Sequence, residues 1–155
     1  MLRYPDGLPP AQREGYAFNT VSPLQRTPLE SGRARQRRRF TDVPTLATVR
    51  WRFTDVQGMA FEAWFRDALM DGAEYFECPL KVPESPYGLN FYLARFTDIY
   101  AGPGLVSGSV SLWDYTATLE LKERPILPRP WGEFPDLILH GNIIDLALNQ
   151  EWPLA

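Results

Sequence analysis

The stretch "VRWRFTDVQGMAFEAWFRDALMDG", residues 49–72, joins two kinds of hydrophobic periodicity within one short segment. In its first five residues, apolar side chains alternate with arginines, so that Val49, Trp51 and Phe53 share one face. This period of two is typical of a half-buried antiparallel strand. The apolar spacing then changes to the i, i+3, i+4, i+7 pattern of an amphipathic helix. The helical stripe consists of Phe61, Trp64, Phe65, Ala68 and Leu69.

The ends of this helix carry recognisable boundary signals. Thr54 is followed three residues later by Gln57, which fits a capping box, and Gly72 is placed to end the helix in the left-handed region. The segment therefore predicts a strand that runs directly into a helix at residues 56–71, with its apolar stripe in the core.

Other strands are indicated on both sides of this segment. The clearest is "YTATLELKER", residues 115–124, in which apolar and polar side chains alternate throughout. We also expect strands in "ARQRRRF" (34–40), "EYFECPL" (74–80) and "LNFYLARFTDIY" (89–100). Pro79 suggests an edge or a bulge in the second of these. The stretch "AGPGLVSGSVS", residues 101–111, is expected to be a Gly/Ser-rich loop.

Proline-rich segments flank this pattern. Residues 1–32 hold five prolines and little periodicity, which predicts an extended N-terminal arm. Residues 125–155 hold five more and predict a C-terminal arm. Its apolar side chains should pack on the parent domain or on a neighbouring subunit. They are Leu137, Ile138, Leu139, Ile143, Ile144, Leu146 and Leu148.

Together these patterns predict an α+β fold, mainly antiparallel β (a sandwich or small barrel), with one packed helix and extended N- and C-terminal arms. The predicted division is an arm at 1–32, a β-rich core domain at 33–124 and a Pro-rich arm at 125–155. A chain of 155 residues is long enough for one such domain with a hydrophobic core.

Composition argues against several classes of site. Cys78 and His140 are single representatives of their types, which excludes an internal disulfide and a multi-cysteine zinc site. Cys78 alternates with Phe76 and Leu80, so we expect a small buried apolar residue. No apolar run approaches the roughly 18 residues that cross a bilayer, and the N-terminus lacks a signal-peptide pattern. We expect a soluble protein made in the cytosol, with no membrane contact.

Motifs for catalysis are not found in the sequence. Glu74 and Glu77 could form an acid/base pair, but acidic residues after a helix end are usually solvated. There is no H-E-x-x-H, G-x-S-x-G or dinucleotide fingerprint. The expectation is therefore no enzymatic activity, no cofactor and no metal; a cell-wall hydrolase accessory would need a paired-carboxylate cleft that the sequence does not indicate.

Charge is divided unevenly along the chain. Residues 1–55 hold ten arginines and five acidic residues, for +5, whereas residues 56–155 hold six basic and fourteen acidic residues, for −8. Such a dipolar chain can bind a copy of itself head to tail, or place one half on an oppositely charged partner.

The positive charge peaks in "SGRARQRRRF", residues 31–40. On a strand, Arg33, Arg35, Arg37 and Arg39 would share one face, and Arg38 would lie on the other. Such a row can follow phosphates, pair with carboxylates, or simply be solvated. Aromatic residues do not alternate with the basic ones and familiar nucleic-acid motifs are absent, so the pattern favours pairing at an interface.

The order of these segments resembles that of a known family. It comprises "REGYAFN", "ESGRARQRRRF", the strand–helix–turn–strand segment 49–80 and "TATLELKERP". This order is similar to that of the minor tail proteins of tailed bacteriophages, such as minor tail protein M of lambda-like phages. The resemblance covers residues 13–127 and implies a structural subunit of the distal tail, tail tip or hub in the virion. Implied partners are other tail proteins (tube, hub or fibre-attachment subunits) and further copies in a ring.

The predicted function is thus a structural component of a phage tail, with a nucleic-acid-binding module as the alternative. The predicted site is a partner interface that combines the arginine row with apolar residues of the C-terminal arm. Its residues are Arg33, Arg35, Arg37, Arg38, Arg39, Trp131, Leu137, Leu139, Ile143 and Trp152.

Overall fold

The predicted junction between strand and helix is present in the structure, a computed structural model that describes residues 1–108 and 110–141. Strand β5 (Thr45–Thr54) runs directly into helix α1 (Asp55–Asp67). On β5, Val49, Trp51 and Phe53 are at most 1% exposed, as the alternation predicts. The chain divides into two units, Met1–Pro125 and Ile126–Ala155, which are described separately below.

Helix α1 begins at its predicted cap and ends earlier than predicted. The Thr54 hydroxyl accepts a hydrogen bond from the backbone N–H of Gln57 at 3.4 Å, and the Gln57 side chain accepts one from the Thr54 N–H at 3.1 Å. The helix was expected over 56–71 but spans 55–67. It is shorter because Met70, Asp71 and Gly72 all have positive φ, of 49°, 57° and 89°. The chain thereby turns sharply before the next strand.

One seven-stranded sheet contains most of the strands, in the order β1-β6-β7-β9-β5-β2, with β8 also paired to β9. The new elements are β1 (Leu2–Arg3), β2 (Ala17–Thr20), β6 (Phe76–Leu80), β7 (Asn90–Phe96), β8 (Ala101–Leu105) and β9 (Leu112–Leu121). Of these pairings, β1 with β6 is parallel and the others are antiparallel. The predicted α+β class with mainly antiparallel strands and one packed helix is confirmed.

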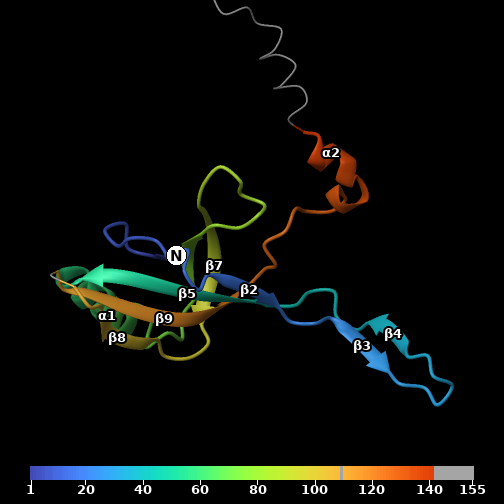
Figure 1. The fold of residues 1–155 in the computed structure, drawn as a ribbon, viewed down its shortest axis with the longest axis horizontal. Helices are drawn as coiled ribbons and strands as arrows, with labels where there is room; N and C mark the ends of the chain where they lie inside the picture. Colours follow the sequence, from blue (N-terminus) through green and yellow to red (C-terminus); the bar gives the residue numbers. More distant parts are fainter. Residues whose placement is uncertain (109, 142–155) are drawn as a thin grey trace, which may run out of the picture. The chain divides into compact units, whose positions relative to one another are not determined.

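Strand β9 is the centre of the sheet. It pairs with β5 over ten residues on one side, and with β7 and β8 at separate positions on the other. Figure 1 shows β7 running across the direction of β5 and β9, with α1 lying against those two long strands. The predicted alternation in this strand is confirmed, since Tyr115, Ala117, Leu119 and Leu121 are buried.

Aromatic rings fill the space between the helix and the sheet. Phe61 of α1 is fully buried, and its ring centroid lies 5.1–5.4 Å from those of Trp51, Phe53, Tyr100 and Tyr115. Aromatic pairs at such separations add to the stabilisation that comes from burial of their area. The predicted apolar stripe of the helix therefore lies in the core.

The N-terminal segment, predicted as an extended arm, contributes two strands to the seven-stranded sheet. Strand β1 pairs with β6, β2 pairs with β5, and Tyr4 is 3% exposed beside Trp51. Prolines 5, 9 and 10 lie between these two short edge strands rather than inside them, so they remove no ladder hydrogen bond. The predicted boundary at residues 32 and 33 falls within the turn of a separate hairpin, β3 (Leu24–Thr27) with β4 (Arg35–Arg38).

Part of the predicted Gly/Ser-rich loop forms strand β8, and that expectation was wrong for residues 101–105. Gly102 has φ +117°, and a Cβ atom there would lie 2.6 Å from the carbonyl oxygen of Asp114. The register between β8 and β9 also shifts between Ala101 and Gly104. Glycine here permits an irregular edge strand to lie close to β9, rather than breaking the strand.

The second unit contains a short 3₁₀ turn, Trp131–Glu133, and helix α2 (Pro135–Leu139). Its described side chains are exposed, Leu137 and Leu139 to 64% and 71%. The apolar residues predicted at 143–148 lie outside the described residues. Within the described part of the chain, no helix is long and apolar enough to cross a membrane.

The structure predicts that a methyl group at residue 102 destabilises the fold. Gly102→Ala should lower the free energy of unfolding by about 2 kcal/mol or more, because it combines a disfavoured φ with a clash against Asp114. Gly88→Ala is the matched control, since a Cβ at residue 88 meets no atom within 4 Å. Urea unfolding of the three proteins would measure this, and equal stability of both variants would contradict it.

Candidate assembly interface

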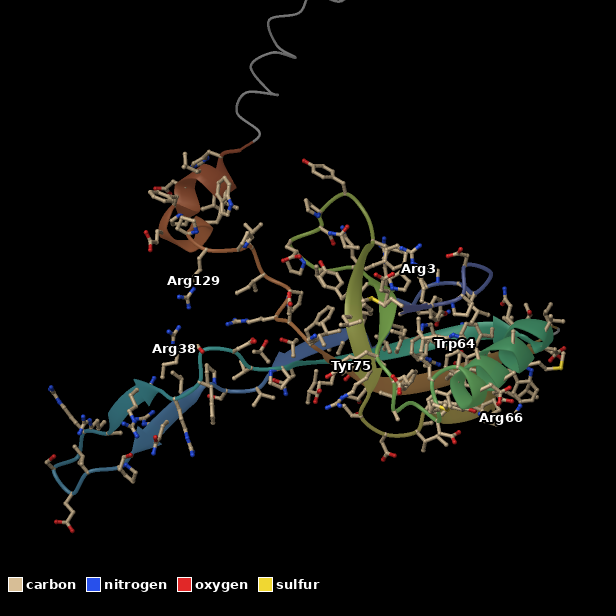
Figure 2. All side chains as sticks on the ribbon, turned by 180° about the vertical axis from the view of Figure 1, so that it is seen from behind. Arg3, Arg38, Trp64, Arg66, Tyr75 and Arg129 are labelled. Atoms are coloured by element: carbon tan, nitrogen blue, oxygen red, sulfur yellow. The ribbon has the colours of Figure 1, made fainter. Side chains whose placement is uncertain are left out.

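The arginine run forms one strand of an exposed hairpin. Strand β4 pairs with β3 in the register Leu24 with Arg38, Gln25 with Arg37, Arg26 with Gln36 and Thr27 with Arg35. All four residues of β4 are exposed. The hairpin stands out from the seven-stranded sheet in Figure 1, and side chains, including that of Arg38, project from it in Figure 2. We call β3, β4 and their connecting turn, residues 24–38, the arginine hairpin.

The two faces of the arginine hairpin follow from its register, because residues directly opposite each other point to the same side. Arg35 and Arg37 share one face, and Arg38 lies on the other with Arg26, as the alternation predicts for β4. Arg33 and Arg39 lie outside the strand, so the predicted row of four is reduced to two within β4. Arg26 is a further residue of this site that the sequence does not predict, because β3 lacks an apolar alternation that would indicate a strand.

The hairpin arginines have few partners of their own. Arg37 donates from Nε and Nη2 to the side-chain oxygen of Gln25, at 3.2 and 3.0 Å. The guanidinium of Arg39 lies 5.2 Å from the ring centroid of Phe40, within the range of a cation–π contact. Among residues 1–108 and 110–141, no salt bridge forms to Arg26 or to any arginine from 33 to 39.

The arginines of β5 provide a contrast. Arg50 and Arg52 both donate to Asp114 on β9, Arg52 through two bonds of 2.7 and 3.0 Å, and Arg50 also lies 3.2 Å from Glu14. Hydrogen bonds from Arg52 and then from Arg50 lower the pKa of Asp114 from 3.8 to about 2. The sheet arginines Arg50 and Arg52 thus have a carboxylate partner, whereas in the described part of the chain the arginines of the hairpin form no salt bridge, although Glu30 lies in its connecting turn.

The two segments that lead into the hairpin bond to each other at its base. The N–H of Arg39 donates to the carbonyl of Pro23 at 2.7 Å, and that of Val21 donates to the carbonyl of Pro44 at 3.2 Å. Strands β3 and β4 pair only with each other in the described residues. An isolated two-stranded hairpin is marginally stable in water, so this one would gain from a partner surface.

The remaining predicted interface residues lie in the second unit. Trp131, Leu137 and Leu139 are 46–71% exposed, which suits a contact surface. Ile143 and Trp152 lie outside the described residues. These apolar residues belong to the second unit, whereas the arginine hairpin belongs to the first.

Cys78 and Glu77 were also considered for chemistry in the sequence. Cys78 is buried and unpaired, and burial raises the pKa of its thiol. Glu77 accepts from Arg3 at 3.0 Å on the surface. In the described residues, no three His, Cys, Asp or Glu side chains are grouped so that they could hold a metal ion.

Sequence reasoning missed a groove of about 990 Å³ between the segment Pro10–Phe18 and the loop Lys81–Leu89. Its two walls meet at Tyr16, whose hydroxyl accepts from the N–H of Lys81 at 2.8 Å and donates to the Lys81 carbonyl at 2.9 Å. Burial raises the pKa of this phenol to about 12, so it is a neutral donor at physiological pH. The only hint in the sequence was the cluster of prolines and aromatics in each segment.

Comparison with known proteins returns no match for this chain: no protein-family model, no curated protein and no solved structure.

The Asp114 cluster predicts a pH dependence of stability. Because folding lowers the pKa of Asp114 from 3.8 to about 2, its contribution is present above pH 3.8 and is lost as the pH falls toward 2. Asp114→Asn should therefore be less stable than the parent at neutral pH, and should lose less stability than the parent over that acid range.

Urea unfolding between pH 2 and pH 6 would test this prediction. Asp42→Asn, at an exposed position away from the arginines of β5, is the control. Parallel stability curves for the parent protein and Asp114→Asn would contradict the assignment.

Proposed function

We propose that this chain is a structural subunit of a bacteriophage tail that binds neighbouring tail proteins through its arginine hairpin. The observation that carries the proposal is the exposed hairpin, whose arginines form no salt bridge within the described residues. The resemblance of residues 13–127 to minor tail proteins supplies the context. The proposed role is structural rather than enzymatic, and the proposed location is the virion tail.

Guanidinium chemistry supports a carboxylate-bearing partner. A planar guanidinium binds carboxylates through two parallel hydrogen bonds, as Arg52 does with Asp114 in this protein. A partner that presents Asp or Glu to Arg35 and Arg37 could use the same geometry. Residues 56–155 carry a net charge of −8, so a second copy is one suitable partner, and heterologous contacts of this kind close into rings when the rotation permits. Tube, hub or fibre-attachment subunits are the others.

A nucleic-acid-binding module is the second candidate. It is favoured by one observation, namely that arginines project from both faces of the hairpin, as phosphate-tracking arms do. Against it, Phe40 is the one aromatic residue in the sequence from 24 to 40, so the hairpin itself carries no row of aromatic rings on which bases could stack.

Charge reversal on one face of the hairpin tests the assembly role. Arg35→Glu/Arg37→Glu should reduce incorporation of the subunit into tails at least about tenfold, because each new carboxylate repels an acidic partner. The melting temperature of the isolated protein should stay within about 2 °C of the parent, since both positions are exposed.

Lys122→Glu/Arg124→Glu is the matched control, with the same change in charge at exposed positions outside the hairpin. Tail assembly is scored by electron microscopy and by the subunit content of purified particles. Normal tails from the hairpin variant would rule out the proposed interface.

The salt dependence of DNA binding distinguishes the nucleic-acid role from the assembly role. If the hairpin binds phosphates, the logarithm of its association constant for a random DNA duplex should fall linearly with the logarithm of the salt concentration. The expected slope is about −0.9 per phosphate contacted. We expect no such binding at 150 mM salt, roughly the physiological ionic strength. Fluorescence anisotropy with the parent and Arg35→Glu/Arg37→Glu would measure it. A steep slope that the hairpin variant reduces would favour the nucleic-acid role.

A further inference from the structure

The groove between Pro10–Phe18 and Lys81–Leu89 is a preformed surface with an unusual lining. Prolines come from both walls, at positions 10, 83 and 86, and aromatic rings come from Tyr16, Phe18 and Tyr87. The rings of Tyr16 and Phe18 pack edge to face with centroids 5.2 Å apart. Tyr87, at 98%, and Leu89, at 47%, are exposed at its rim.

Both walls are anchored, so the groove does not have to be formed by its ligand. The N–H of Gln12 donates to the carbonyl of Arg50 at 2.7 Å, which ties the first wall to β5. In the second wall, Ser85 is buried and its hydroxyl bonds to the backbone of Val82, while the Lys81 ammonium donates to the Ser85 carbonyl. A surface that is already ordered loses little entropy when a ligand binds.

A groove lined by aromatic and proline side chains suits one class of ligand particularly well. Proline-rich segments adopt the polyproline II conformation before they bind, and they dock into aromatic-lined grooves at little entropic cost. Arg13 and Lys81 are the charged residues of this lining, so an acidic group next to the prolines would also be accommodated.

This chain contains a segment of that chemistry. The stretch "PILPRPWGEFPD", residues 125–136, has the P-x-x-P spacing at Pro125 and Pro128, which lie outside helix and strand; Glu133 and Asp136 follow in the 3₁₀ turn and in α2. Apolar side chains at seven positions of the described second unit are 42–71% exposed. They are Ile126, Leu127, Trp131, Phe134, Leu137, Ile138 and Leu139. Exposed apolar side chains at so many positions of one short segment favour an interaction site.

We propose that the groove binds residues 125–136 of a second copy of this chain. The prolines and Trp131 lie on the aromatic floor, and Glu133 and Asp136 pair with Arg13 and Lys81. Exchange of such a segment between identical chains is a low-cost route to oligomers, and in a closed ring every groove is occupied. The inference depends on the groove and the segment alone, and it stands or falls separately from the arginine hairpin and from the phage-tail proposal.

Carbodiimide cross-linking of the full-length protein tests this pairing directly. The chain has two lysines, Lys81 in the groove and Lys122 outside it, so the possible amide products are few. We expect a peptide that joins Lys81 to Glu133 or Asp136, identified by mass spectrometry. Its absence from the parent protein would overturn the proposal.

A complementing pair of variants decides whether the link forms between copies. One copy carries Lys81→Arg and lacks the amine; the other carries Glu133→Gln/Asp136→Asn and lacks the carboxylates. Neither can form the link alone. Co-expressed, they should form it at about a quarter of the parental yield, since one of the four combinations of copies is competent. Loss of the link in the mixture would show that a chain binds its own segment, and would overturn the proposal.

Variants of the groove rim complete the test. Tyr87→Ser/Leu89→Ser should reduce the cross-link at least about tenfold and shift the protein toward monomer in sedimentation. Val56→Ser, at an apolar position on α1 that is 69% exposed, should change neither. Arg35→Glu/Arg37→Glu should also leave the cross-link intact, so a failure of the hairpin interface is distinguishable from a failure of the groove. An undiminished link in the rim variant would place the segment elsewhere.

Discussion

The ten-residue antiparallel pairing of β5 with β9 is the constraint on which the rest of the first unit depends. It sets Trp51 opposite Tyr115 and Phe53 opposite Trp113, and it sets Arg52 opposite Asp114. One register thus determines both the aromatic inner face and the charged outer face, and a slip of one residue would exchange them. Strand β2 extends this pair from β5, while β7 and β8 extend it from β9. Helix α1 follows β5 without a loop, so its stripe is brought onto the same inner face.

The parts of the fold that the sequence predicts are those in which side chains carry a periodic signal. Strand β5, strand β9 and the capped start of α1 are of this kind, because burial on one face requires alternation and capping requires particular residues. Strands β1, β2 and β8 lack that signal. Strand β8 is exposed along its length and contains Gly102, Pro103 and Gly104, a composition typical of loops; it is a strand because β9 offers an unpaired edge.

The candidate interface likewise has parts that the sequence predicts and parts that it does not. The opposite facing of Arg37 and Arg38 follows from strand geometry and was predictable. The hairpin was not, because β3, "LQRT", has no alternation and is recognised as a strand only through its partner. The groove was not predictable either, because its walls meet at Tyr16 and Lys81, which are 65 residues apart in sequence. Contacts over such separations depend on the sheet order, which local patterns do not determine.

The arginine hairpin and the groove differ in their physical character. Charge on an exposed surface such as the hairpin generally accelerates encounter and favours oppositely charged partners, but exposed ion pairs contribute little free energy and are weakened by salt. Burial of aromatic and proline side chains contributes affinity that salt does not remove, and large apolar anchors in pockets dominate most interfaces. If both proposals hold, the arginine hairpin orients neighbouring subunits and the groove holds them together. Assembly would then begin through the hairpin at low ionic strength, whereas persistence of the assembled state at high salt would depend on the groove.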